Sequence, residues 1–167
     1  MYGMRVDEKT AEQYVPFGCT EFVIQGQSTG TPNICINLLK LLTIYMNDGI
    51  DPIDGKRKSG PVPLKKLEEY QTFEEFYDGY KALLDYYLDL SVKAQYHSYE
   101  VMNQHVSFLF TSLLTDDCIA RGKALLDGGV RYLGGTNETY GNINTSDSLV
   151  GNPGSGIQSK KNTRYGN

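Results

Sequence analysis

Two residues near the N-terminus have types and a spacing that could perform chemistry. Cys19 and Glu21 stand two positions apart in residues 16–24, a segment in which a short β-type run follows a Pro/Gly turn. Because side chains alternate between the two faces of a strand, we expect both to point the same way, where one substrate could meet both. We therefore take Cys19 and Glu21 as the candidate catalytic pair.

The pairing of a thiol with a carboxylate favours one type of chemistry over another. A nearby negative charge raises the pKa of a thiol, and no histidine follows in the local sequence to activate Cys19, so a cysteine-protease reading is disfavoured. One-electron chemistry needs no thiolate: a thiyl radical abstracts a hydrogen atom from carbon, while a carboxylate moves a proton. On the spacing alone, a buried cysteine beside a surface glutamate would still be favoured.

The other cysteines and the histidines do not indicate a metal or redox site. Cys19, Cys35 and Cys118 are odd in number and widely spaced, which suits neither a disulfide framework nor zinc. Cys35 and Cys118 are interpreted as structural, Cys35 as a small core residue of an apolar helix. His97 and His105, eight positions apart, are interpreted as partly buried helix residues. No metal and no bound cofactor are expected.

Composition narrows the class of protein. The 167 residues are 40% hydrophobic and 22% charged, as in one globular domain, and the net charge of -4 provides no field for nucleic acid. No apolar run reaches the length of a membrane span and no secretory signal pattern is present, so a cytoplasmic protein without membrane contact is expected. The 13 tyrosines and absent tryptophan suggest aromatic faces packed on another surface.

The first half of the chain predicts two helices around the candidate pair. A short helix over residues 7–15 would be capped by Asp7 and ended by Pro16. A second, buried helix would run from Thr31 to Met46, with Pro32 in its first turn, before a loop over residues 47–63.

The second half of the sequence predicts a series of helices. Thr72 would cap a long helix reaching Glu100 or beyond, with Glu75 completing a capping box. Shorter helices are expected over 104–114 and 116–126, then a strand over 130–133, a loop over 134–144 and a last helix over 147–150 capped by Thr145 or Ser146. Residues 151–167 have almost no apolar side chains and are expected to form a disordered tail.

Residues 14–22, Tyr-Val-Pro-Phe-Gly-Cys-Thr-Glu-Phe, resemble the cysteine loop of glycyl radical enzymes of the pyruvate formate-lyase-like family, in which Gly-Cys-x-Glu follows a short helix. Collinear similarity continues over residues 37–52, 72–76, 112–132 and 140–149. Residues 1–150 are thus identified as a partial pyruvate formate-lyase-like domain.

The resemblance implies a fold and a reaction. The fold class would be α/β, a fragment of the ten-stranded α/β barrel that is predominantly helical over this span. Cys19 would carry the thiyl radical, and Glu21 would be the general acid or base of the dehydratase and lyase branch, which acts on small organic substrates in anaerobic metabolism. The residue after Cys19 is Thr20, whereas pyruvate formate-lyase itself has two adjacent cysteines.

The sequence differs from the glycyl radical enzymes in two respects. Family members are several times longer, with most of the barrel before the cysteine loop. They also end in a glycine loop resembling Arg-Val-x-Gly-Tyr, where a radical-SAM activase installs the glycyl radical; Arg164-Tyr165-Gly166 is not that motif. We therefore predict a fragment from a truncated or frame-shifted gene, inactive alone. The alternatives are a subunit of a split glycyl radical enzyme, acting with complementary chains or as a homodimer, and a helical binding module without chemistry.

Overall fold

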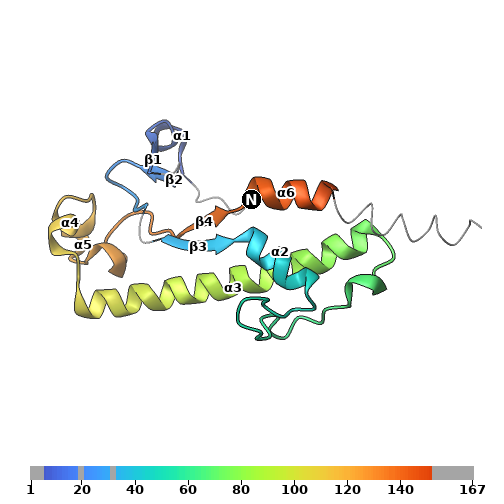
Figure 1. Cartoon of the computed structure of the whole chain (residues 1–167). Helices are drawn as coiled ribbons and strands as arrows, with labels where there is room; N and C mark the ends of the chain where they lie inside the picture. The colour runs from blue at the N-terminus through green and yellow to red at the C-terminus, as the bar shows by residue number, and fades with distance from the viewer. Residues whose placement is uncertain (1–5, 19–20, 31–32, 152–167) are drawn as a thin grey trace, which may run out of the picture. The chain divides into compact units, whose positions relative to one another are not determined.

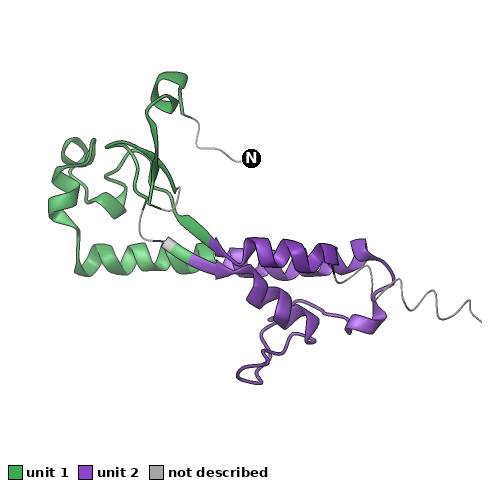
Figure 2. Cartoon of the chain, turned by 45° about the horizontal axis from the view of Figure 1, so that its top comes forward, with its two compact units in different colours: residues 1–34, 91–138 green, residues 35–90, 139–167 purple. Residues whose placement is uncertain are grey.

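The structure, a computed structural model, describes residues 6–18, 21–30 and 33–151. Cys19 and residues 152–167 of the predicted disordered tail lie outside these residues. The chain divides into two compact units (Figure 2): residues 1–34 with 91–138, and residues 35–90 with 139–167. We refer to these as unit 1 and unit 2 and describe each by itself.

Unit 1 begins with a short helix and a hairpin (Figure 1). Helix α1 spans Glu8–Ala11, and the Asp7 carboxylate accepts a hydrogen bond from the Thr10 amide at 3.0 Å, which confirms the predicted cap. The helix is shorter than the predicted 7–15, because strand β1, Tyr14–Phe17, pairs antiparallel with β2, Glu21–Ile24. The rings of Tyr14 and Phe22 stack across this hairpin with centroids 4.6 Å apart.

Two further predictions fail where strands β3 and β4 form. Strand β3, Asn33–Asn37, occupies the first turns of the predicted helix 31–46, and only Leu38–Met46 is helical, as α2. Its partner β4, Thr136–Tyr140, lies in the predicted loop 134–144. Neither strand is stable alone, so the pairing partner, far away in sequence, decides both. Cys35 is therefore an exposed strand residue and not a core residue of a helix.

Unit 2 is built around tyrosines. Buried Tyr45 of α2 packs its ring 4.9 Å from Phe76 and donates a hydrogen bond to the Phe76 carbonyl at 2.8 Å. Phe76 belongs to α3, Phe73–His105. A Cβ atom at Gly79 of α3 would lie 2.2 Å from the Tyr45 hydroxyl, so this mid-helix glycine makes room for the phenol. Several tyrosines thus pack within their own unit, although Tyr96 of α3 is exposed.

The predicted cap of α3 is confirmed in part. The Glu75 amide donates to the Thr72 hydroxyl at 3.1 Å, as expected. The Glu75 carboxylate accepts from the amide of Gln71 at 2.9 Å rather than from that of Thr72, and it also pairs with Lys65. Before this cap, the chain forms a short 3-10 helix, η1, Leu67–Glu69.

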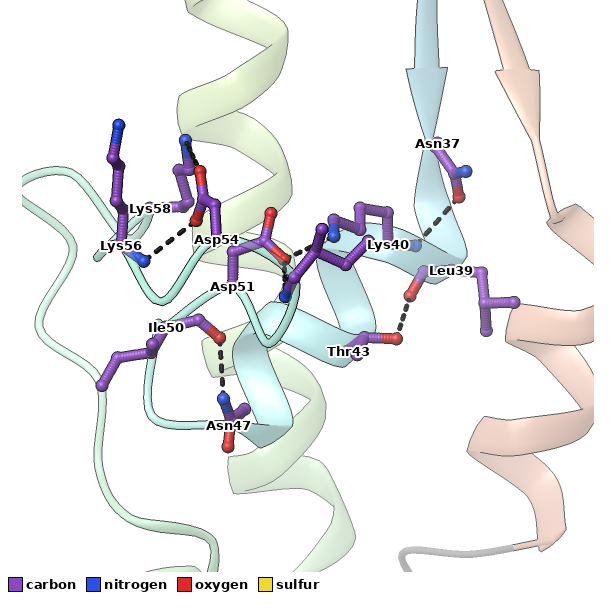
Figure 3. A network of polar contacts seen from close by, with 11 residues as sticks. Asn37, Leu39, Lys40, Thr43, Asn47, Ile50, Asp51, Asp54, Lys56 and Lys58 are labelled. Carbon is purple, nitrogen blue, oxygen red and sulfur yellow. Dashed lines mark hydrogen bonds and ion pairs between the residues drawn. The ribbon is translucent and has the colours of Figure 1, made fainter.

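The loop after α2 is held by ion pairs, shown in Figure 3. Lys40 of α2 pairs with Asp51, whose carboxylate also accepts from the Ile53 amide at 2.9 Å. Asp54 accepts from the Lys56 amide at 2.9 Å and pairs with Lys58 at 3.0 Å. The hydrogen bond from Lys40 and, after it, that from the Ile53 amide hold the pKa of the Asp51 carboxyl below its usual value.

The second part of unit 1 breaks the predicted helices into shorter pieces. Helix α3 ends at His105, and α4, Leu109–Leu113, starts anew, so the predicted helix 104–114 is interrupted. The predicted helix 116–126 becomes α5, Cys118–Arg121, and the 3-10 helix η2, Leu125–Asp127. The predicted strand 130–133 is reduced to a single bridge between Tyr132 and Ser28. Beneath these pieces lies a small core of Tyr99, Cys118, Leu125, Leu126 and Val130.

The last described helix belongs to unit 2. Helix α6, Asn142–Gly151, begins five positions before the predicted helix 147–150 and packs against α2. Gly141, with φ +73°, precedes it, and a Cβ atom there would lie 2.9 Å from that of Leu39. Thr145 is buried within the helix and does not cap it. Among the described helices, none is long and apolar enough to cross a membrane.

Candidate active site

Glu21, the carboxylate of the predicted pair, is the first residue of β2 and stands opposite Phe17 in the hairpin. Its side chain is only 8% exposed, an unusual position for a carboxylate. On an antiparallel pair the residues opposite each other share a face, so Val15, Phe17, Glu21 and Val23 face one side of the hairpin. The hairpin therefore fixes the direction of the carboxylate.

Gly18 lies directly against this carboxylate. Its φ of +56° belongs to the left-handed region, and a Cβ atom built on it would lie 2.7 Å from Glu21 Oε2 and 3.1 Å from Oε1. The backbone conformation favours glycine here, and a Cβ atom at this position would force the Glu21 carboxylate to move. Sequence reasoning placed Gly18 in a turn but missed its contact with the carboxylate, which no local pattern signals.

Cys19 and Thr20 lie outside the described residues. The pairing of Phe17 with Glu21 leaves residues 18–20 as the connection between the two strands. Cys19 stands two positions before Glu21 in the sequence. The same-side arrangement of their side chains stays a prediction.

The far end of β2 is tied to two distant segments of unit 1. The Gly26 carbonyl accepts a hydrogen bond from the Asp116 amide at 2.9 Å, and the Gln27 carbonyl accepts one from the Tyr132 amide at 2.9 Å. The Ile24 amide donates to the Ser28 hydroxyl at 2.8 Å, which closes the turn between them. Both of these distant segments adjoin the unit 1 core. Their hydrogen bonds therefore fix the position of the residues that follow β2.

A hollow of about 270 Å³ lies on the opposite face of β2. Phe22 and Ile24 line it, together with Ser28, Thr29, Tyr132 and residues 134–137. Phe22 and Ile24 alternate with Glu21 and Val23, so the hollow and the carboxylate lie on different faces. The hydroxyl of Ser28 is already bonded to the backbone of Ile24. The hollow is not the place where Glu21 would meet a substrate.

The remaining cysteines and histidines do not gather into a second site. Within the described ranges, no group of three or more His, Cys, Asp or Glu side chains could hold a metal ion. Cys118 is buried in the unit 1 core, and burial raises the pKa of its thiol. His97 is exposed and lies 3.5 Å from Glu100, which is a surface contact.

Comparison with known proteins assigns the chain to a family. The family model named Pyruvate formate lyase-like matches residues 1–151, a range that includes every described residue. The protein belongs to this family, which is that of the glycyl radical enzymes.

Curated relatives are dehydratases. The chain is 29% identical over 115 residues to trans-4-hydroxy-L-proline dehydratase of Clostridioides difficile, an alignment covering 69% of this chain and 14% of that protein. It is 25% identical over 149 residues to the probable dehydratase YbiW of Escherichia coli strain K12, covering 87% of this chain and 18% of that protein. The chain thus spans less than a fifth of the length of these relatives.

A solved structure gives the fold. The glycerol-bound, B12-independent glycerol dehydratase of Clostridium butyricum matches with a TM-score of 0.80 and 25% identity, over 94% of this chain and 20% of that chain. The predicted fold class, an α/β and predominantly helical part of the glycyl radical enzyme barrel, is confirmed.

Proposed function

We propose that this chain is the cysteine-loop segment of a glycyl radical dehydratase or lyase acting on a small organic substrate. Its relatives are named dehydratases, which supports that branch of the family. The observation that carries the proposal is the buried Glu21, held against Gly18 at the end of the hairpin that leads into and out of Cys19. A carboxylate withdrawn from bulk water and fixed in direction suits proton transfer to or from a bound substrate.

In this proposal Cys19 and Glu21 divide the work. The family's glycyl radical, installed by a radical-SAM activase, supplies the unpaired electron. The Cys19 thiyl radical takes a hydrogen atom from a substrate carbon, so that an S–H bond forms as the C–H bond breaks and the unpaired electron moves to carbon. The Glu21 carboxyl group exchanges a proton with a substrate oxygen. Gly18 positions the carboxylate by leaving room for it.

The chain by itself would be inactive. It spans about a fifth of the glycerol dehydratase that it matches, and no stretch resembling the Arg-Val-x-Gly-Tyr glycine loop occurs in it. We propose that the complete enzyme acts in anaerobic metabolism, because carbon- and sulfur-centred radicals react with oxygen, and that it acts in the cytoplasm. A split enzyme, in which this chain docks with complementary chains, is the second candidate. It is favoured by the exposed apolar side chains of α4.

The test compares the chain with a chimera. Residues 1–151 replace the equivalent segment of the C. butyricum glycerol dehydratase, and both proteins are treated with that enzyme's activase and S-adenosylmethionine. Electron paramagnetic resonance should show a glycyl radical doublet for the chimera and none for the chain, and only the chimera should dehydrate glycerol. Glu21→Gln should lower this turnover without loss of the doublet. A doublet from the chain alone, or full turnover of Glu21→Gln, would contradict the proposal.

A further inference from the structure

Arg121, the last residue of α5, ties together two backbone segments of unit 1. Its guanidinium donates hydrogen bonds to the Gly128 and Val130 carbonyls, each at 3.2 Å. The same guanidinium forms an ion pair with the Asp117 carboxylate at 3.1 Å. A guanidinium presents several N–H donors in a rigid planar fork, so one side chain can hold two segments at a set separation.

The two segments that this side chain joins both bind the chain just after β2. The amide of Asp116 donates to the Gly26 carbonyl at 2.9 Å. The amide of Tyr132 donates to the Gln27 carbonyl, also at 2.9 Å. Consecutive residues are thus held from two directions. We call residues 116–117 and 128–132, joined by Arg121, the β2 bracket.

The position of β2 in unit 1 depends largely on this bracket. Its hairpin partner β1 is exposed at all four positions, so β1 gives β2 no buried layer to rest on. The buried end of β2 is Ile24, whose amide donates to the Ser28 hydroxyl at 2.8 Å and whose carbonyl accepts from the Gln27 amide at 3.0 Å. These bonds couple the end of the strand to the residues that the bracket holds.

We infer that Arg121 is a positioning residue for the Glu21 carboxylate, on which it acts through the β2 bracket and not by contact. This inference rests on the proposed function, since it adds a residue that sets the geometry of the same site. A strand rises about 3.3 Å per residue, so Glu21 lies about 10 Å from Ile24, and a tilt of β2 by about 6° moves the carboxylate by about 1 Å. Misplacing a catalytic group by about 1 Å costs on the order of a hundredfold in rate.

The first test measures turnover in the glycerol dehydratase chimera that carries residues 1–151. Arg121→Met removes the guanidinium and with it the tie between the two segments. We expect kcat per glycyl radical, counted by electron paramagnetic resonance, to fall at least about tenfold, with the KM for glycerol within about threefold of the parent value. Arg121→Lys should recover part of the loss, because an ammonium group can still donate to a backbone carbonyl.

Arg57→Met is the matched control. Arg57 also holds a loop, by donating to the Asp48 carbonyl at 3.1 Å and to the Ser59 hydroxyl at 3.2 Å, but it lies in unit 2. The control should keep kcat within about twofold of the parent chimera. An Arg121→Met chimera with a lower melting temperature and the parental kcat per glycyl radical would show a purely structural side chain and would overturn the inference.

The second test does not depend on turnover. In the full 167-residue chain, Arg121→Met should raise the hydrogen-exchange rates of the Asp116 and Tyr132 amides at least about tenfold, and those of the β2 amides with them. Arg57→Met should leave these rates unchanged. Equal exchange of the parent chain and Arg121→Met would overturn the inference.

Failure of this inference is separable from failure of the proposed function. A parent chimera that forms the radical but does not turn over glycerol would count against the proposed function, while faster exchange in Arg121→Met would still support the bracket. An active parent chimera with unchanged kcat in Arg121→Met would count against the inference alone.

Discussion

Replacing Gly18 by alanine tests whether this glycine positions the Glu21 carboxylate. The free-energy cost of placing alanine in a left-handed backbone conformation is measured by a control described below. The methyl group would lie 2.7 Å from Glu21 Oε2, where an ordinary contact begins at 3.4 Å, so the carboxylate must retreat by about 0.7 Å. Misplacing a catalytic group by about 1 Å costs on the order of a hundredfold in rate. We expect turnover of the glycerol dehydratase chimera to fall between about tenfold and a hundredfold.

Gly122→Ala is the matched control for this experiment. Gly122 has nearly the same φ, +59°, and a Cβ atom there would meet nothing within 4 Å. Both substitutions should lower the free energy of unfolding of the chain by about 1 kcal/mol, the cost of a left-handed alanine. Only Gly18→Ala should also lower turnover. Turnover of the two variants within about threefold of each other would refute the positioning role of Gly18.

Three further predictions concern stability and thiol reactivity. Ser112→Ala should lower the free energy of unfolding by about 2 kcal/mol because the buried Leu125 amide loses its hydrogen-bond acceptor. Ser98→Ala, on the exposed side of α3, should change the free energy of unfolding by less than about 0.5 kcal/mol. Equal urea midpoints for the two variants would contradict this prediction. Burial raises the pKa of Tyr80 to about 12, so the folded chain keeps a proton that the unfolded chain loses near pH 10; stability should therefore fall as pH rises from 10 to 12, and a Tyr80→Phe variant with the same slope would count against it. Iodoacetamide should alkylate exposed Cys35 at least about tenfold faster than buried Cys118 in peptide mapping of the native chain, and comparable rates would show that the core around Cys118 opens readily.

Local signals were sufficient for the elements with strong caps and periodicity. The Asp7 cap, the Thr72 start of α3 and the strand at Glu21 follow from short-range rules and are present in the structure. The helix boundaries after residue 105 depended on long-range contacts, such as the bond between Ser112 and the Leu125 amide, and were not predictable from neighbouring residues.

The strands show the same limit more sharply. Residues 33–37 have an apolar pattern that is equally compatible with a helix, and residues 136–140 have the composition of a loop. Each becomes a strand because the other is its partner, about a hundred residues away in the chain. For the candidate site, sequence resemblance indicated Glu21 and Cys19. The packing of the Glu21 carboxylate against Gly18 could be recognised only from the three-dimensional structure.

The central claim is that Cys19 carries the reacting thiol. The most direct test is turnover of the activated chimera with Cys19→Ala, beside Cys35→Ala as a matched loss of an exposed thiol. We predict that Cys19→Ala retains the glycyl radical doublet but dehydrates no glycerol above background, while Cys35→Ala turns over like the parent chimera. Turnover by Cys19→Ala at the parental rate would contradict the claim.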